Sequence, residues 1–181
     1  MDELSEQGVA QRAQVQRERD GERRHISIVV TIASALAVVS TLISWANHPL
    51  VERSTAHPRT WVLHEVSHSI GLLTSLAGPA VLVLAIAQLW TAGELRRGSI
   101  KAGWATLLAA LVMLGLSSGE IAVLLLGRRN FLDHSRRLNP AQYPPLAHAV
   151  GAGLWLAVLA SVVVLAGASF YLRRSYATWR W

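Results

Sequence analysis

Four long apolar segments constrain this chain more than any other feature of its sequence. They cover residues 26–46, 62–90, 104–126 and 146–172. Each exceeds the length of about 18 apolar residues at which a membrane-spanning helix becomes the expected structure. Because hydrocarbon offers the backbone no hydrogen-bond partner, each segment must pair its own N–H and C=O groups, which favours helices. The predicted fold is therefore all-α, an integral membrane four-helix bundle over residues 26–172.

The composition favours a membrane protein over a soluble enzyme. Hydrophobic residues make up 52% of the 181 residues and charged residues 15%, whereas a soluble domain carries about 25% charged residues. There is no cysteine, which excludes disulfides, Cys-ligated metals and thiol nucleophiles. The net charge of +6 does not predict a nucleic-acid partner, because Glu18, Asp20 and Glu22 interleave with the arginines of the N-terminal tail.

The distribution of Lys and Arg predicts the orientation. Residues 1–25 are expected to be a tail, disordered or transiently helical, and residues 173–181 a short basic tail. These tails and the 91–103 loop hold 11 of the 17 Lys and Arg residues, and the other two loops hold six. The positive-inside rule then places both termini in the cytoplasm of a multi-pass protein of the bacterial plasma (inner) membrane. The expected partners are the lipid bilayer and other membrane subunits.

Three local features refine this prediction. Ser44 and Ala46 fit the small-residue positions of a signal-peptide cleavage site, but the 21-residue apolar run favours a first helix that is retained. Trp45 and Trp61 are expected at the headgroup level, as part of an aromatic belt. Pro79 is expected to kink the second helix, because proline removes a backbone donor.

Ionisable residues inside the apolar segments are the candidate functional residues. They are His64, Glu65 and His68 in the second segment, Glu120 in the third and His148 at the start of the fourth. At 1.5 Å per helical residue, the predicted boundaries place all five in one layer near the outer leaflet. His64 and His68 are four residues apart, so on a helix they share a face. We therefore expect His64, His68, Glu120 and His148 to converge.

The sequence from His64 to His68 resembles the HExxH motif of zincin metalloproteases. In that motif two His residues at i and i+4 hold zinc, and the Glu acts as a base on metal-bound water. The resemblance implies a membrane-embedded zinc hydrolase with Glu65 as its catalytic residue. Glu120 or His148 would be the third ligand that a catalytic zinc site requires.

Two other hypotheses do not need this resemblance. Four-helix bundles build cofactor sites from facing helices, so His64, His68 and His148 are candidate ligands of a b-type haem. Together with Glu120 they also suit a zinc or copper ion. Either cofactor indicates a redox or accessory subunit of a membrane complex, which is the preferred prediction. The remaining alternative is a scaffold or assembly protein without a cofactor, in which the polar residues are interhelical hydrogen bonds. Whether the protein is an enzyme is left open.

The run Leu146-Ala147-His148-Ala149, and Gly119-Glu120 in the third segment, resemble a second group of proteins. This is a bacterial four-helix integral membrane family of uncharacterised function. Its members have a His at the same helix start and an acidic residue after Gly. The resemblance covers about two helices, and it implies the fold but no activity.

Overall fold

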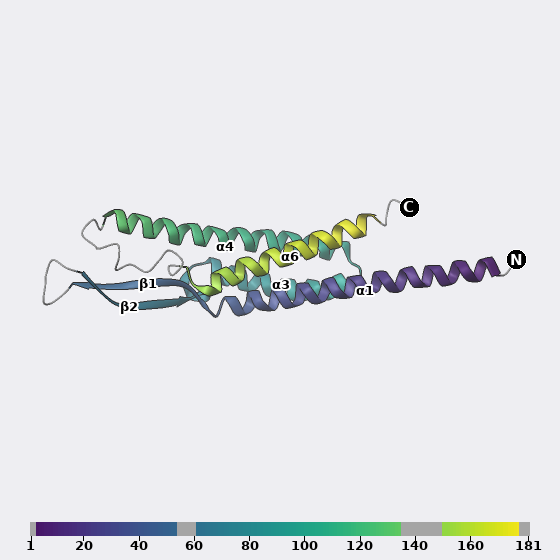
Figure 1. Cartoon of the computed structure of the whole chain (residues 1–181), viewed down its shortest axis with the longest axis horizontal. Helices are drawn as coiled ribbons and strands as arrows, with labels where there is room; N and C mark the ends of the chain where they lie inside the picture. Colours follow the sequence, from purple (N-terminus) through teal and green to yellow (C-terminus); the bar gives the residue numbers. More distant parts are fainter. Residues whose placement is uncertain (1–2, 54–60, 135–149, 178–181) are drawn as a thin grey trace.

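The computed structural model of the chain describes residues 3–53, 61–134 and 150–177. It is an elongated helical bundle with a β-hairpin at one end, and α1 begins and α6 ends at the other (Figure 1). The elements follow in the order α1 (Glu3–Ser40), β1 (Ser44–Arg53), β2 (Trp61–Ile70), α2 (Gly71–Thr74), α3 (Ala77–Arg96), α4 (Ile100–His134) and α6 (Ala152–Ala177).

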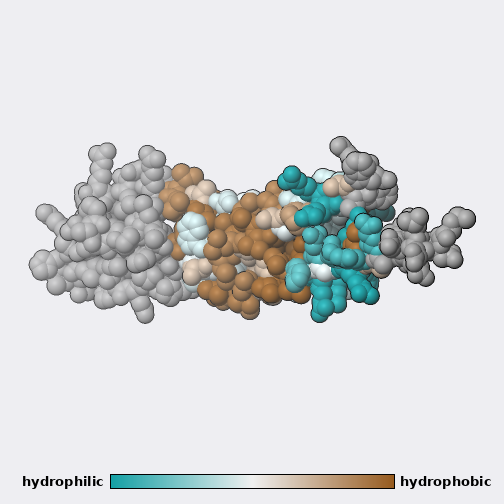
Figure 2. Space-filling view, turned by 45° about the vertical axis from the view of Figure 1, so that its right-hand side comes forward, coloured by the Kyte–Doolittle hydropathy of each residue, from teal (hydrophilic) through white to brown (hydrophobic). Residues whose placement is uncertain are grey.

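Four helices are long and apolar enough to cross a membrane, which confirms the predicted number of such helices. The candidate membrane-spanning ranges are Ala13–Ser40, Ala77–Arg96, Ile100–Gly127 and Ala152–Ala177. α1 and α4 each pack against both α3 and α6, so the four helices form a ring. Their outer surface is an apolar band that gives way to hydrophilic residues towards the end with the termini (Figure 2).

The hairpin corrects the all-α prediction and the first two predicted helix ranges. Instead of spanning 26–46, the first helix ends at Ser40, and the chain then forms β1, which pairs antiparallel with β2. Instead of one helix over 62–90, residues 61–70 are a strand and α3 begins only at Ala77.

Two physical reasons account for the late start of α3. The first part of the predicted 62–90 segment places the β-branched residues Val62, Val66 and Ile70 among polar side chains, which suits a strand. Pro79 is the third residue of α3. In the first turn of a helix its missing N–H costs nothing, because that group has no intrahelical partner. Pro79 therefore marks the beginning of a helix and not the predicted kink.

α1 and α4 are longer than the sequence predicts, and α6 is shifted towards the C-terminus. α1 begins at Glu3, so of the two states expected of the tail, residues 3–25 adopt the helical one; they are rich in Glu, Gln, Arg and Ala, which have high helix propensity. α4 extends the predicted 104–126 helix to His134. α6 begins at Ala152 rather than at 146 and continues past 172 to Ala177. In each case a helix started by an apolar span propagates into flanking helix formers.

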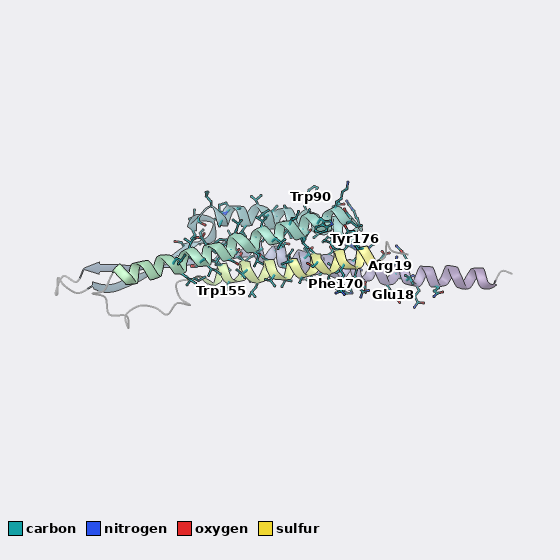
Figure 3. All side chains as sticks on the ribbon, turned by 90° about the horizontal axis from the view of Figure 1, so that it is seen from above. Glu18, Arg19, Trp90, Trp155, Phe170 and Tyr176 are labelled. Atoms are coloured by element: carbon teal, nitrogen blue, oxygen red, sulfur yellow. The ribbon has the colours of Figure 1, made fainter. Side chains whose placement is uncertain are left out.

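Small side chains fill the interior of the ring. Two apolar clusters make up the core, one towards each end, and alanine is the commonest residue in both. Large side chains mostly point outward, as Trp90 on α3 and Trp155 on α6 do (Figure 3). This distribution is typical of membrane helices, where small residues allow backbones to approach closely.

Trp45 closes the core at the hairpin end. Its side chain is fully buried in a core cluster. The indole N–H donates a hydrogen bond to the carbonyl of Ser40 at 2.8 Å. Gly71 is required beside it, since a Cβ atom at residue 71 would lie 2.5 Å from Trp45 Nε1.

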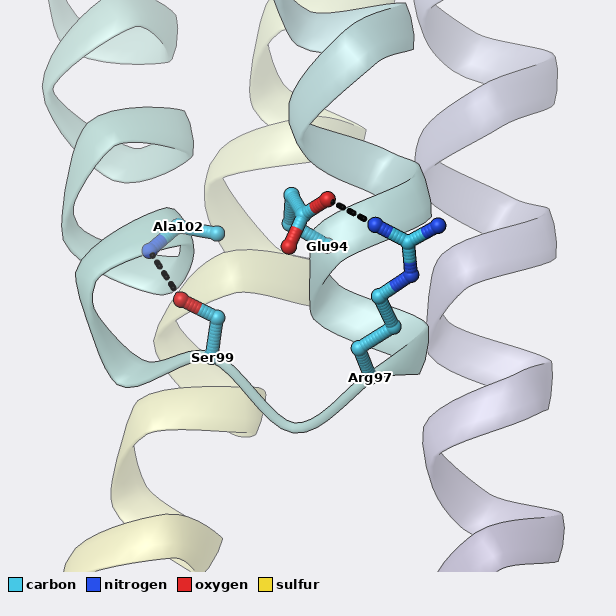
Figure 4. Close-up of polar contacts among 4 residues, drawn as sticks. All are labelled: Glu94, Arg97, Ser99 and Ala102. Carbon is cyan, nitrogen blue, oxygen red and sulfur yellow. Dashed lines mark hydrogen bonds and ion pairs between the residues drawn. The ribbon is translucent and has the colours of Figure 1, made fainter.

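A tight turn joins α3 to α4 at the opposite end (Figure 4). Gly98 has a φ of 87°, a conformation that favours glycine. The hydroxyl oxygen of Ser99 accepts a hydrogen bond from the backbone N–H of Ala102 at 3.3 Å and so caps the first turn of α4. Glu94 and Arg97 form an ion pair across the last turn of α3.

The burial of Trp45 predicts a large loss of stability on truncation. We expect Trp45→Ala to lower the free energy of unfolding by about 3 kcal/mol or more, because it leaves a cavity against α6. Trp90→Ala is the matched control: its side chain is 81% exposed, so its effect should be much smaller. Unfolding in mixed micelles with increasing SDS measures both. Equal losses for the two variants would contradict the buried position of Trp45.

Candidate functional site

Three of the five predicted site residues lie in the hairpin. His64, Glu65 and His68 belong to β2, where Glu65 pairs with Leu50 and His68 with Asn47. The predicted shared face and common depth both assumed a helix with a rise of 1.5 Å per residue, whereas a strand rises about 3.3 Å. The predicted placement of these three residues in a membrane helix is therefore wrong. Their roles as ligands or base stay predictions.

His148 lies outside the described residues. The nearby residues Val150 and Gly151 form backbone hydrogen bonds with the hairpin. Val150 forms an antiparallel bridge with Ala46, and Ala46 also pairs with Ser69 of β2. The backbone N–H of Gly151 donates to the carbonyl of Trp45 at 2.8 Å. The backbones of β2 and of the segment leading into α6 thus both lie next to β1 at Ala46.

Glu120 is the one predicted site residue whose side chain the structure describes. It lies half-buried on α4 and accepts a hydrogen bond from the Ser75 hydroxyl at 3.0 Å. The Ser75 oxygen also accepts a hydrogen bond from the backbone N–H of Ala77, the first residue of α3, at 3.2 Å. Glu120 is therefore linked through Ser75 to the amino end of α3, where the helix dipole favours negative charge.

The predicted convergence of ligands is tested only for described side chains. Among these, no three His, Asp or Glu residues lie together as a metal site. Glu120 is linked to Ser75 instead. The side chains of His64 and His68, like the whole of His148, fall outside that description. A site for zinc, copper or b-type haem thus stays a prediction.

A buried polar layer divides the core, and the sequence analysis missed it. Ser34 of α1, Gln88 of α3 and Ser161 of α6 are almost wholly buried, each lying along its helix between residues of the two apolar clusters. The Ser34 hydroxyl donates to Gln88 Oε1 at 3.3 Å. Gln88 Nε2 is buried and has no hydrogen-bond partner within the described residues. A lone amide in an apolar span was the available signal, since such groups are costly in hydrocarbon unless paired.

Two further hydrogen bonds join neighbouring helices nearer the end with the termini. The hydroxyl of Ser27 on α1 donates to the carbonyl of Ala92 on α3 at 2.7 Å. The hydroxyls of Thr91 on α3 and Thr106 on α4 lie 2.8 Å apart and share a hydrogen bond. With the pair of Ser34 and Gln88, these contacts fix α3 against both of its neighbours.

A row of small residues lies on the outer face of α4. At 100° per residue its members fall within about 100° of arc, and all of them are exposed: Gly115, Ser118, Gly119 and Ala122. A Cβ atom added at either glycine would meet nothing within 4 Å. The larger side chains of Leu111 and Leu126, also exposed, border the row at its two ends. The bundle does not use this face for its own packing.

Comparisons with known proteins identify no relatives from which a function could be carried over. The chain matches no protein-family model, and no curated protein matches it in sequence. The resemblances to zincin metalloproteases and to a bacterial four-helix membrane family therefore stay predictions.

The contact between Ser75 and Glu120 predicts a measurable coupling. In a double-mutant cycle of Ser75→Ala and Glu120→Ala, we expect a coupling energy of about 0.6 kcal/mol and at most about 1.7, the range for hydrogen bonds between membrane helices. Glu120→Gln keeps an acceptor and should lose less. Ser118→Ala, on the exposed face of the same helix, is the control. Unfolding in bicelles gives these values, and independent effects of the two substitutions would contradict the contact.

Proposed function

We propose that this protein is an accessory subunit of a membrane complex, and that it binds a transmembrane helix of a partner subunit along the outer face of α4. One observation carries the proposal: the open row of Gly115, Ser118, Gly119 and Ala122. Small residues at a spacing of four let two helix backbones approach closely, which is the main source of affinity between helices in lipid.

The bundle satisfies its own packing without this row. The buried residues of α4 lie on its other face, and they include Ala102, Thr106, Ala110 and Met113. That face packs against α3 and α6, which closes the ring. The small residues thus lie where a fifth helix would pack, with Leu111 and Leu126 positioned to contact its ends.

The proposal places the protein in the bacterial inner membrane with its termini in the cytoplasm. Two observations support this orientation. Most Lys and Arg residues belong to the tails and the 91–103 segment, as the positive-inside rule requires of cytoplasmic segments. The hydrophilic surface next to the apolar band lies at the same end (Figure 2).

Photo-crosslinking in cells tests the helix-binding face. A photoreactive amino acid at Ser118 should form a discrete adduct with one membrane protein. Gly115→Leu combined with Gly119→Leu should reduce that adduct at least tenfold, because two branched side chains hold the partner helix away from α4. Gly93→Leu is the matched control, since Gly93 is an exposed glycine of α3 with nothing within 4 Å of an added Cβ.

Three results would count against the proposal. One is an adduct only with lipid. Another is an adduct with a second copy of this chain, which would make the face a self-association surface. The third is a partner adduct that the two leucines leave unchanged, because the contact would then lie elsewhere.

A second candidate function is that this subunit holds a metal ion or b-type haem near the outer leaflet. The backbone contacts at Ala46 favour it. They bring β2, which carries His64 and His68, and the chain leading into α6 to the same residue of β1. His148 precedes Val150 by two residues in the sequence. A haem or a copper ion bound there would supply redox chemistry to the complex, whereas a zinc ion would not.

The cofactor hypothesis makes a spectroscopic prediction. We expect the purified wild-type protein to carry a Soret band, or stoichiometric zinc or copper by elemental analysis. His68→Ala with His148→Ala should remove the cofactor, whereas Glu65→Gln should keep a haem spectrum, because Glu65 is not among the predicted haem ligands. Wild-type protein without haem, zinc or copper would contradict this hypothesis and leave the binding of a partner helix unaffected.

A further inference from the structure

A groove lies on the outer surface between α1 and α3, near the end that carries the termini. Its volume is about 330 Å³. Two arginines and a mixture of hydroxyl and apolar side chains line it: Arg24, Ser27, Ile28, Thr31, Ile32 and Arg96. The groove therefore runs along α1 from a charged end to an apolar end.

The hydroxyl groups of the groove are already paired. Ser27 donates to the carbonyl of Ala92 at 2.7 Å, and Thr31 donates to the carbonyl of Ser27 at 2.8 Å. The first of these bonds holds α1 against α3, and the second lies within α1. Within the described residues, the guanidinium groups of Arg24 and Arg96 are therefore the unpaired hydrogen-bond donors of the groove.

Arg24 and Arg96 are exposed, and neither has an ion-pair partner within the described residues. Two carboxylates close to them in sequence form ion pairs with other arginines. Glu94 pairs with Arg97 (Figure 4), and Glu22 lies 3.6 Å from Arg174. The described lining includes no acidic residue, so the charged end of the groove is complementary to an anion.

The apolar end of the groove continues along the membrane-spanning part of α1. Ile28 and Ile32 are 45% and 57% exposed and lie one turn apart on the same face. From Arg24 to Ile32 the helix rises about 12 Å. Arg96 is the last residue of the candidate membrane span Ala77–Arg96, and Arg24 lies just before the apolar run of α1 that begins at Ile26. That spacing matches a phospholipid, with its headgroup at the arginines and an acyl chain on the isoleucines.

We propose that this groove binds an anionic phospholipid, with its phosphate between Arg24 and Arg96 and one acyl chain along Ile28 and Ile32. Basic pockets between membrane helices suit acidic headgroups, and the guanidinium group can donate two hydrogen bonds to one phosphate. The proposal requires that the bundle spans a bilayer, but it does not depend on a partner helix at α4. The bound lipid would bridge α1 and α3 on the outside of the ring.

Native mass spectrometry of the full chain in micelles tests this assignment. We expect phosphatidylglycerol to bind more tightly than phosphatidylcholine. Arg24→Gln with Arg96→Gln should weaken phosphatidylglycerol binding about 30-fold, because each basic residue near an acidic headgroup contributes about fivefold in affinity. Arg97→Gln is the matched control: this exposed arginine is already paired with Glu94 and should change the affinity less than twofold.

The remaining measurements separate the alternatives. Arg24→Lys with Arg96→Lys keeps both charges and should restore most of the affinity, which excludes misfolding as the cause of the loss. Competition by millimolar inorganic phosphate would instead indicate a free-phosphate site and overturn the lipid assignment. Equal binding of the two lipids, or unchanged binding in the Arg24→Gln/Arg96→Gln variant, would also overturn it. Gly115→Leu with Gly119→Leu should leave lipid binding unchanged, so the two proposals can fail separately.

Discussion

A helix long and apolar enough to cross a membrane must satisfy its own backbone, because hydrocarbon provides no partner for an N–H or C=O group. The four apolar helices pair these groups internally along their whole length. At the helix ends, backbone groups that lack a partner within the helix form local hydrogen bonds. The N–H of Thr41 donates to the carbonyl of Val38 after α1, and the side-chain oxygens of Ser75 and Ser99 accept N–H bonds from the first turns of α3 and α4. These serine side chains near the helix ends thus accept hydrogen bonds from backbone groups that have no partner within the helix.

The same solvent weakens the usual reason for helices to associate, because lipid tails are as apolar as leucine. The bundle depends instead on close packing of small residues and on interhelical hydrogen bonds. The contacts of Ser27 with Ala92 and of Ser34 with Gln88 fix α1 against α3. A buried amide accepts few alternative arrangements of its neighbours. Gln88 therefore gives the core a defined register that an interior of alanine alone would lack.

Part of this architecture could be predicted from the sequence. Hydropathy alone identifies four spans, because a long apolar run admits few structures other than a helix. The hairpin was missed because the stretch from Trp61 to Ile70 adjoins the apolar start of α3 and was counted with it. Pro79 was interpreted as a kink, although its position after Gly78 equally suits the first turn of a helix. Such boundaries depend on tertiary contacts, such as the burial of Trp45 against α6, which no local pattern records.

The candidate site was harder to predict than the fold. Its geometry followed from a helical assumption for His64 and His68, and an error in secondary structure changes both the direction and the depth of every side chain. Glu120 was recognised as an unusual charge in an apolar span, but its partner Ser75 could be found only from the structure. Gln88 was overlooked because a neutral side chain does not stand out in a search for ionisable groups.

α1 runs without a break from Glu3 to Ser40, a length of about 57 Å. Its first part projects beyond the other helices (Figure 1), and its last residue accepts the indole hydrogen bond of Trp45, beside the hairpin. A continuous helix of this length bends little, so it moves as one rigid element. A change in the tilt of the projecting part must move the opposite end as well. The two ends of the bundle are thereby mechanically connected through a single element, with the Trp45 ring as the point where that motion reaches the hairpin.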